Sequence, residues 1–411
     1  MISLNKIISS EKKYSFIYFF LFLLMLVSDD SFWFGTNDNN LFVQIKFMFL
    51  GLLPFLLLLN KKSKKIGYLD GAVVLALIVV LVFVSSLINS SKLINGSTVV
   101  CFLLVAGCLI VRRFPLNIFF HCFSNIIVLL SLYSIIIYLF VQMGLIHLTP
   151  VDNIGGSIVY AANGCAFLTP NGVLYRNAAI FREPGMFIIY VCLAFLFDVC
   201  TSRKLNIYRV VIYGLAIITS YSTAGFLLFG LILFLQFYNA GNLRKGMLFL
   251  IPIIAFVTFI YLYKDVYLDV FGKLIDGTDN GSTRSRWAST IIPLYIIPDY
   301  ILFGCGLDEY VKLFDKLSMQ IFHTDASGSP SSNTILSSMA IWGVWMGAFF
   351  IASIWSFSKK MSRNRFSTLL VFIIIVLLYS NEVRYLSIYT YIIAFYGLSK
   401  RHSTQIDNSK F

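Results

Sequence analysis

The apolar residues of this chain fall into about a dozen blocks, each of a length that crosses the hydrocarbon core of a bilayer. A chain in lipid must satisfy its backbone hydrogen bonds internally, and α-helices do so. Of the 411 residues, 58% are hydrophobic and 12% are charged, whereas about 25% of the residues of a soluble domain are charged. The sequence therefore predicts an all-α integral membrane protein, with residues 1–411 forming a single polytopic membrane domain.

The hydropathy pattern predicts twelve spans, at residues 14–28, 41–59, 69–89, 97–111, 117–146, 185–201, 207–221, 224–238, 247–263, 333–356, 366–380 and 385–399. The block 207–238 is read as two spans that turn at SYSTAG (220–225), the alternative being one long kinked span. Basic clusters then occur in every second segment that flanks or connects these spans. They are Lys12/Lys13, Lys61/Lys62/Lys64/Lys65, Arg112/Arg113, Arg203/Lys204, Arg244/Lys245, Lys359/Lys360/Arg363/Arg365 and Lys400/Arg401.

The positive-inside rule places these basic clusters in the cytoplasm, and twelve spans then leave both termini on that side. The net charge of +13 is explained by this topology, so no nucleic-acid partner is expected. Two long loops, residues 147–184 and 264–332, face outward. Long loops of a compact domain usually carry function, and we expect the site there. The second loop is predicted to include short interfacial helices, because Trp287 and its tyrosines suit the headgroup level.

Five arginines lie on the outer side, where the positive-inside rule disfavours them: Arg176, Arg182, Arg284, Arg286 and Arg384. A guanidinium offers planar, bidentate donors that match phosphate oxygens. As a set, these arginines favour a phosphate or pyrophosphate headgroup as ligand. The alternative for each of them is a pair with a loop carboxylate or with a lipid phosphate.

The stretch FREPGMF (181–187) opens an apolar block. Pro184 suits the first position of a helix, where its missing N–H costs nothing. Glu183 then lies at the positive end of the helix dipole. This helix start explains Pro184 and Glu183 structurally, but it leaves Arg182 without a role.

His323 stands close to Asp325, and a histidine beside an acid can act as a general base toward a sugar hydroxyl. Asn333 is expected to cap the helix that follows it. Asp29 and Asp30 follow the first span, and we expect them to be solvated charges at a helix end. The seven cysteines show no metal-ligand spacing, so no metal is expected. A disulfide between Cys165 and Cys305 is the less favoured alternative to two buried thiols.

Four stretches, taken in order, resemble the bacterial Wzy-type polysaccharide polymerases and their relatives, the O-antigen ligases. The stretches are FREPGMF, SYSTAGFLLFGLILF, STRSRW…PDYILFGCGLDEY (282–310) and SSNTILSSMAIWGVWMG. The second is similar to a Ser/Thr/Gly-containing break between two spans, and the third contains a Gly-x-Gly-Leu. The sequence departs from the pattern at Ser222, because relatives often carry an arginine directly after this serine, whereas Thr223 follows it here.

The resemblance implies a glycosyltransferase-C-like fold and a glycosyltransferase that acts at the outer face of the bacterial inner membrane. Its substrate would be an undecaprenyl-pyrophosphate-linked oligosaccharide, with no cofactor, and a chain-length regulator is a further implied partner. Arg182 with Arg284 or Arg286 would bind the leaving pyrophosphate, and Arg176 and Arg384 are additional candidates. Glu183 or His323 would be the catalytic base.

Two other activities remain open beside polymerisation. Ligases usually carry a histidine directly before the Asn-x-x-Leu helix, whereas Ser332 precedes Asn333 here, so the resemblance favours the polymerase. A flippase for lipid-linked oligosaccharides would keep charged groups inside its helix bundle. The predicted spans contain few such groups, which favours the enzyme over the transporter.

Overall fold

The computed structural model describes residues 15–28, 30–35, 40–59, 72–89, 96–152, 158–168, 175–201, 206–241, 281–322 and 332–399. The chain is mostly helical, and it forms two compact units. Unit 1 comprises Met1–Lys46, Phe114–Asn153 and Ser157–Gly225, and unit 2 comprises Phe47–Arg113, Ile154–Gly156 and Phe226–Phe411. The expected single domain is not tested by this division and stays a prediction.

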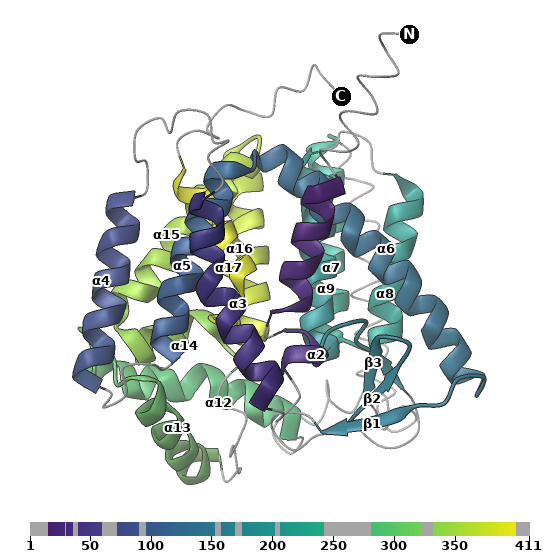
Figure 1. Ribbon diagram of the computed structural model, residues 1–411. Helices are drawn as coiled ribbons and strands as arrows, with labels where there is room; N and C mark the ends of the chain where they lie inside the picture. The colour runs from purple at the N-terminus through teal and green to yellow at the C-terminus, as the bar shows by residue number, and fades with distance from the viewer. Residues whose placement is uncertain are drawn as a thin grey trace. The chain divides into compact units, whose positions relative to one another are not determined.

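Unit 1 contains a long helix that is buried over most of its length, labelled α7 in Figure 1. Its helices are Ser15–Leu26, α2 (Phe32–Gly35), α6 (Leu116–Gln142), α7 (Pro184–Thr201) and α8 (Ile207–Ser220). Helices α6, α7 and α8 all contact one another, and the side chains from Met186 to Phe197 on α7 have no exposed surface. Because α7 is apolar on every side, it is stable only inside a protein or a membrane.

Unit 2 contains the remaining helices that the structure describes, two of which are shared with unit 1. Helices α3 (Asn40–Leu59) and α9 (Thr223–Asn239) begin in unit 1 and continue in unit 2. The others are α4 (Ala72–Asn89), α5 (Gly96–Arg113), α12 (Gly281–Ile296), α13 (Leu307–Phe322), α14 (Thr334–Trp342), α15 (Val344–Met361), α16 (Arg365–Asn381) and α17 (Ile388–Leu398), with a 3-10 turn at Ile297–Asp299.

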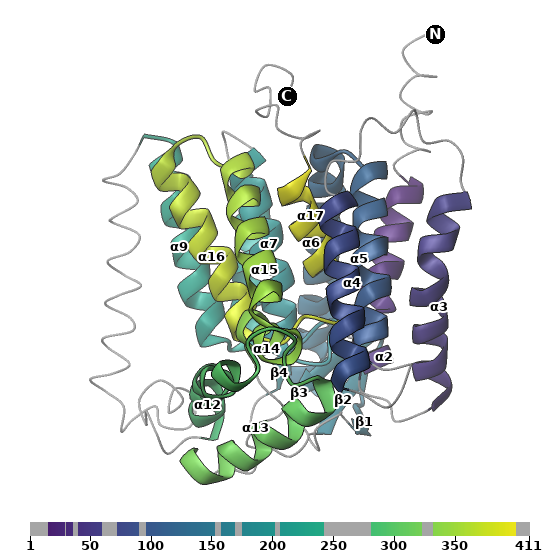
Figure 2. The same ribbon diagram turned by 90° about the vertical axis from the view of Figure 1, so that its left-hand side faces the viewer.

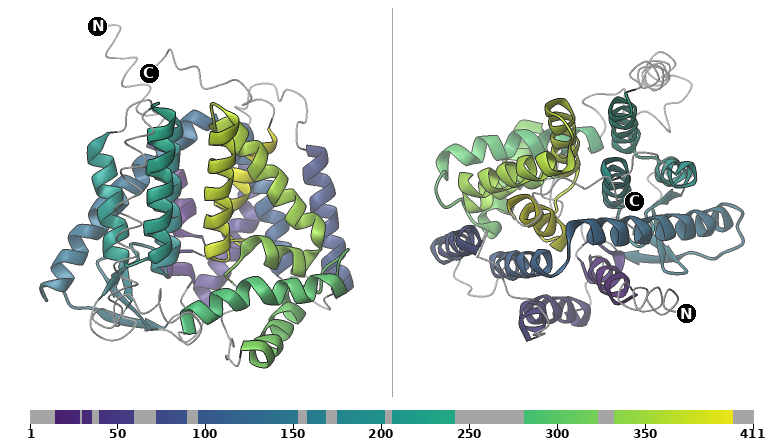
Figure 3. Two further views of the ribbon diagram at one scale, coloured as in Figure 1. Left: turned by 180° about the vertical axis from the view of Figure 1, so that it is seen from behind. Right: turned by 90° about the horizontal axis from the view of Figure 1, so that it is seen from above.

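Glycines let α17 pack closely against its neighbours in unit 2, where Figure 3 shows α15, α16 and α17 grouped together. A Cβ atom added at Gly397 would lie 2.1 Å from the Ser353 carbonyl oxygen of α15. One added at Gly107 of α5 would lie 2.9 Å from the Cβ of Tyr391. Figure 2 shows α12 and α13 at the end of unit 2 where α14 begins.

Helices occur at every predicted span except 247–263, which lies outside the described residues. Among the residues that the structure describes, α5, α6 and α7 are long and apolar enough to cross a membrane. Shorter apolar helices accompany them, at Ser15–Leu26, Met48–Leu57, Val73–Asn89, Ile207–Ser220, Thr223–Asn239, Arg365–Asn381 and Ile388–Leu398. The chain is therefore compatible with an all-α membrane protein.

The predicted span 333–356 differs, because it is two helices that meet at Gly343. This glycine has φ 110° and separates α14 from α15. Val344 donates its N–H to Ile301, outside both helices, and a Cβ atom at Gly343 would lie 2.2 Å from the Leu302 oxygen. The helix ends here because the backbone of another segment occupies the space beside it.

The segment predicted to be the first outer loop, residues 147–184, contains a four-stranded antiparallel sheet, which the all-α prediction missed. The strands are β1 (Thr149–Asp152), β2 (Ile158–Ala162), β3 (Cys165–Leu168) and β4 (Arg176–Asn177), in that order across the sheet. Tyr160 pairs with Phe167, and Leu168 pairs with Arg176. The β2–β3 turn is Asn163–Gly164, with φ 47° and 78°, and Asn-Gly between strands is the strongest short-range signal of a hairpin.

Each face of the sheet packs on apolar side chains of unit 1. One face, with Cys165 and Phe167, contacts Ile137, Tyr138 and Val141 near the C-terminal end of α6. The other face contributes Val159 and Ala166 to a cluster with Phe32 and Ala178. The sheet is thereby fixed to the helix that precedes it and to the segment that leads into α7.

Candidate functional site

The FREPGMF stretch is held in place by the short segment that follows the N-terminal helix. Ser31 and Phe181 form an antiparallel bridge. On either side of it, Phe32 N–H donates to the Ile180 oxygen at 3.0 Å and Arg182 N–H donates to the Asp30 oxygen at 3.0 Å. Two segments about 150 residues apart in the sequence are thus joined directly beside Arg182.

Asp30 is buried, contrary to the expectation of a solvated helix end. It is 2% exposed, and its Oδ2 accepts a hydrogen bond of 2.6 Å from the hydroxyl of Tyr190 on α7. A buried carboxylate must be hydrogen-bonded to be tolerated, and Tyr190 supplies such a bond. Tyr190 also stacks on Phe181, with ring centroids 4.4 Å apart, so the same side chain supports both joined segments.

Arg182 and Glu183 are partly exposed at the N-terminal end of α7. Helix α7 begins at Pro184, which confirms the prediction for this proline. The Glu183 carbonyl accepts the N–H of Phe187 at 3.2 Å, so Glu183 occupies the position just before the first turn. The structure thus places an arginine and a carboxylate together at the positive end of a helix whose remaining length is buried.

Arg176 lies at the break between α8 and α9. Its Nε donates to the Ser220 oxygen at 3.1 Å and its Nη2 to the Tyr221 oxygen at 3.4 Å. Tyr221 has φ 49°, the left-handed conformation that ends α8. A cation at a helix C-terminus is favourable because carbonyl oxygens there lack partners. The two predicted helices of block 207–238 are therefore confirmed, and an arginine from β4 stabilises the turn between them.

Asn177 connects the same turn to α6. Its Nδ2 donates to Ser134 Oγ at 3.1 Å and to Thr219 Oγ1 at 3.2 Å, and its Oδ1 accepts the Ala179 N–H at 2.9 Å. Asn177 has no exposed surface. Since Ala179 has φ 50°, these bonds also fix the turn that leads to Ile180 and Arg182.

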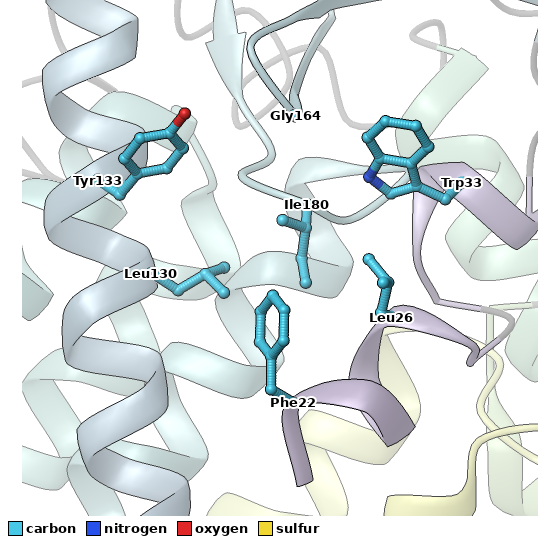
Figure 4. A pocket seen from close by; sticks show the side chains of 7 residues that line it. All are labelled: Phe22, Leu26, Trp33, Leu130, Tyr133, Gly164 and Ile180. Atoms are coloured by element: carbon cyan, nitrogen blue, oxygen red, sulfur yellow. The ribbon is translucent and has the colours of Figure 1, made fainter. Parts of the chain in front are cut away.

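A cavity of about 480 Å³ opens at the surface of unit 1 (Figure 4). Phe22 and Leu26 of the N-terminal helix and Trp33 of α2 line one part of it. The remaining lining residues are Leu130 and Tyr133 of α6, Gly164 of the β2–β3 turn, and Ile180, which precedes Phe181. The Tyr133 hydroxyl donates to the Asn163 oxygen at 2.8 Å, which holds the turn over the cavity. The cavity has the size of a small-molecule site, and its lining is almost wholly apolar.

In unit 2, Arg384 is buried with 1% of its surface exposed. Its Nη2 donates to Ser387 Oγ at 3.0 Å, and its main-chain N–H donates to Thr334 Oγ1 at 2.9 Å. Asn333 caps α14 as predicted, because its Oδ1 accepts the Leu336 N–H at 3.0 Å. Arg384 therefore lies where α14 and α17 begin, and both helix ends are positive.

The Gly-x-Gly-Leu motif contacts the C-terminal end of α14 in unit 2. Cys305 N–H donates to the Ala340 oxygen at 2.9 Å, and Gly306 N–H donates to the Ile341 oxygen at 3.0 Å. Gly304 has φ 65°, and a Cβ atom there would lie 2.2 Å from the Ile341 backbone. These glycines allow the segment after α12 to pack directly on the end of α14.

The remaining predicted residues are placed only in part. Arg286 is exposed on α12, and Arg284 lies on the same helix with its side chain outside the described residues. His323 also lies outside the described residues. The predicted second outer loop, residues 264–332, contains helices α12 and α13, and Trp287 on α12 is 56% exposed. The interfacial location of these helices stays a prediction.

Cys165 and Cys305 are free, buried thiols. Burial raises the pKa of each thiol to about 12. Neither is thereby suited to act as a nucleophile at neutral pH, because the thiolate is the reactive form. Within the described ranges, no three His, Cys, Asp or Glu side chains gather in a way that would hold a metal ion.

A polar cluster lies within the helices of unit 1, and no sequence pattern predicts it. Arg209 Nε lies 2.8 Å from Asp198 Oδ2, and the same oxygen accepts the Tyr213 hydroxyl at 2.8 Å. Arg209 Nη1 donates to Asn125 Oδ1 at 2.8 Å, and Asn125 donates to the Tyr18 hydroxyl at 2.7 Å. The cluster joins four helices of unit 1. Asp198 and Arg209 are eleven residues apart, on α7 and α8, a spacing that gives no periodic signal.

Comparison with known proteins gives no family assignment. No protein-family model matches this chain, and no curated protein matches it significantly. The resemblance to polysaccharide polymerases thus stays a prediction from four short stretches. Unit 1 carries a guanidinium and a carboxylate at the start of α7, and Ile180, two residues before Arg182, lines the apolar cavity.

Proposed function

We propose that this protein is a polymerase of surface polysaccharide, in the manner of the Wzy-type O-antigen polymerases. It would transfer the growing glycan from undecaprenyl pyrophosphate to another lipid-linked repeat unit at the periplasmic face of the bacterial inner membrane. The observation that carries this proposal is the placement of Arg182 and Glu183 at the start of the buried helix α7, held there by the bridge to Ser31.

The reaction needs a base for the acceptor and a charge partner for the leaving group. An acceptor hydroxyl oxygen attacks the anomeric carbon of the donor glycan, and the bond from this carbon to the pyrophosphate oxygen breaks. The proton passes to Glu183 or His323, and the leaving pyrophosphate carries the developing negative charge. Arg182, with Arg284 or Arg286, offsets this charge through bidentate hydrogen bonds.

Arg176 supplies an arginine at the span break in place of the one that relatives carry after the serine. Its contacts with the Ser220 and Tyr221 carbonyl oxygens support this part of the proposal. Arg176 and Arg384 are the further candidates for the pyrophosphate. Both guanidinium groups donate to groups at helix ends, so each also has a structural role.

The proposed topology has twelve spans with both termini in the cytoplasm, and the fold is proposed to be glycosyltransferase-C-like. The apolar helices at the predicted spans support the membrane location. The proposed partners are the undecaprenyl-pyrophosphate-linked oligosaccharide, membrane lipids and a regulator of chain length.

The alternatives to a polymerase are an O-antigen ligase and a flippase. An O-antigen ligase would use the same donor and the same arginines, with lipid A-core as acceptor. A flippase would need ionisable groups within the bundle, and the Asp198–Arg209 pair on α7 and α8 is such a group. Tyr213 donates a hydrogen bond to Asp198, and Arg209 donates one to Asn125. These fixed partners favour a structural role of the pair over a role in transport.

The experiment is deletion of the gene in its host, with surface polysaccharide separated on a gel. We expect lipopolysaccharide capped with a single repeat unit, because chains are ligated but not extended. Bare core together with accumulated lipid-linked polymer would contradict the polymerase function and support the ligase function. Bare core with lipid-linked monomers on the cytoplasmic side would contradict both enzymes and support the flippase.

A further inference from the structure

Helix α12 carries Arg284 and Arg286 near its start, and it contacts α13 and α14 (Figure 2). Farther along the helix, Ala288, Ile292 and Ile296 are 1%, 0% and 3% exposed. Positions four residues apart lie on one face of a helix, so these side chains form a single buried stripe. The stripe holds the C-terminal part of α12, whereas Arg286, two residues before the stripe begins, is exposed.

The segment that follows α12 is fixed by hydrogen bonds to two other parts of unit 2. Asn89, the last residue of α4, donates its side-chain amide to the Phe303 and Gly304 oxygens at 3.2 and 3.1 Å. The Val344 N–H, at the start of α15, donates to the Ile301 oxygen at 2.9 Å. The end of α12 that lies away from the arginines therefore has a defined position.

Near the arginines, Ser289 joins α12 to the start of α14. Ser289 is 1% exposed, and its Oγ accepts the main-chain N–H of Ser332 at 2.7 Å. Ser332 precedes Asn333, whose side chain caps α14 by accepting the Leu336 N–H. Because residues three apart are neighbours on a helix surface, Ser289 lies on the turn next to Arg286. The bond thus ties the arginine-bearing end of α12 to a capped helix start.

We infer that Ser289 is a positioning residue of the proposed polymerase. It holds the first turns of α12 at the start of α14, and so it sets where Arg284 or Arg286 meets the leaving pyrophosphate. The inference rests on the proposed function, which assigns the pyrophosphate to these arginines. Ser289 itself touches no reacting atom in this account.

The position of a charged donor matters most in the chemical step. Negative charge on the pyrophosphate grows as the glycosidic bond breaks, so a guanidinium stabilises the transition state more than the bound substrate. A misplacement of about 1 Å far from the chemistry can cost on the order of 100-fold in rate. Loss of the Ser289 bond should therefore lower kcat more than it raises KM.

The test is extension of lipid-linked repeat units by the purified full-length protein in liposomes, with kcat expressed per folded molecule. Ser289→Ala removes the acceptor, and we expect kcat to fall roughly tenfold with KM within about twofold of the unmodified protein. Ser289→Thr keeps a hydroxyl and should restore most of the rate. A lower unfolding temperature with unchanged kcat would show a merely structural bond and overturn the inference.

A second pair of variants tests the same bond from its donor side and covers the case in which Ser289→Ala does not fold. Ser332→Pro removes the N–H donor, whereas Ser332→Ala keeps it. We expect the proline variant to lose kcat as Ser289→Ala does, and the alanine variant to keep it. The double variant Ser289→Ala/Ser332→Pro should lose no more than either single change, because both remove one bond. Additive losses, or equal rates for the two Ser332 variants, would overturn the inference.

Hydrogen exchange at the Ser332 amide measures this hold without any substrate. We expect exchange to be at least roughly tenfold faster in Ser289→Ala, because the amide loses its acceptor. Unchanged exchange would overturn the inference. An unmodified protein that extends no repeat unit would overturn the proposed function and its positioning residue together. Normal kcat of Ser289→Ala beside an active unmodified protein would overturn the positioning role alone.

Discussion

The hydroxyl of Tyr190 on α7 donates a hydrogen bond of 2.6 Å to the carboxylate of Asp30, and both side chains are buried. The two residues are 160 positions apart in the sequence. Since the main-chain oxygen of Asp30 also accepts the Arg182 N–H, this pair fixes the start of α7 to the segment after the first helix. The position of Arg182 thus depends on Asp30.

Tyr190→Phe should lower the stability of the protein without changing its shape. The variant leaves the buried Asp30 carboxylate without this donor, at a cost of about 2 kcal/mol for a hydrogen bond to a charged group. The measurement is the unfolding temperature of the purified protein in detergent. Tyr208→Phe is the matched control, because Tyr208 is 76% exposed. Equal unfolding temperatures for both variants would show that the Asp30–Tyr190 bond contributes nothing.

Arg182→Ala and Arg284→Ala should each abolish polymer formation while the protein stays inserted and abundant. The expected loss of activity is on the order of 100-fold or more, as for removal of one charge-stabilising donor. The measurement is the polysaccharide ladder of the deletion strain complemented with each variant. Arg363→Ala, which removes an exposed arginine between α15 and α16, should restore the normal ladder. Normal ladders from both outer-loop variants would contradict the pyrophosphate-binding role.

Gly304→Ala should destabilise the protein more than Gly144→Ala does. Both glycines have left-handed backbone, with φ 65° and 71°, so the conformational penalty of about 1 kcal/mol is shared. At Gly304 the new Cβ would meet the Ile341 backbone, at 2.2 Å, whereas no atom of the described residues lies within 4 Å of a Cβ at Gly144. Thermal unfolding of the two variants measures the difference. Similar unfolding temperatures would mean that the contact of the Gly-x-Gly-Leu motif with α14 is not tight.

The helices of this fold are predictable from the sequence, because a helix that contacts lipid or a protein interior requires a long run of apolar residues. Blocks at 185–201 and 117–146 are apolar throughout, and the structure has α7 and α6 there. The sheet at 149–177 was missed, because its strands are only two to five residues long and a hydropathy window of span length does not resolve them. The dipeptide Asn163–Gly164 was the available signal for its hairpin.

Cys165 and Cys305 should resist maleimide in native membranes and react after denaturation. Burial raises the pKa of both thiols to about 12, so below this pH they stay neutral in the folded protein, whereas the unfolded thiols already ionise near pH 9. Ile158→Cys is the positive control, since Ile158 is 50% exposed on the same sheet as Cys165. Labelling of the native cysteines as fast as this control at pH 7 would contradict their burial.

Single changes in the Asp198–Arg209 pair should cost more stability than removal of both charges. Arg209→Met leaves the Asp198 carboxylate without its counter-charge, which lowers the stability, and Asp198→Leu in the same chain should recover most of this loss. The measurements are thermal unfolding and the polysaccharide ladder. A stable double variant that makes normal polymer would support a structural pair. A stable double variant with lipid-linked monomers trapped in the cytoplasm would support transport instead.

The candidate site was predictable in its residue types but not in its contacts. Arg182 stood out because the positive-inside rule disfavours it, and Pro184 because it fits a helix start. The burial of Asp30 follows from its bond with Tyr190, which no local pattern reveals. Arg176 was predicted as a ligand of pyrophosphate, and the structure adds its contacts with Ser220 and Tyr221, a relationship between distant segments.

The most direct measurement is reconstitution of the purified protein in liposomes with lipid-linked repeat units extracted from the deletion strain. The account predicts lipid-linked glycans of two or more repeat units and release of undecaprenyl pyrophosphate. The Arg182→Ala protein, shown to be folded by its unfolding temperature, should form neither product. Liposomes in which the unmodified, folded protein leaves every repeat unit unextended would contradict the central claim that this chain joins them.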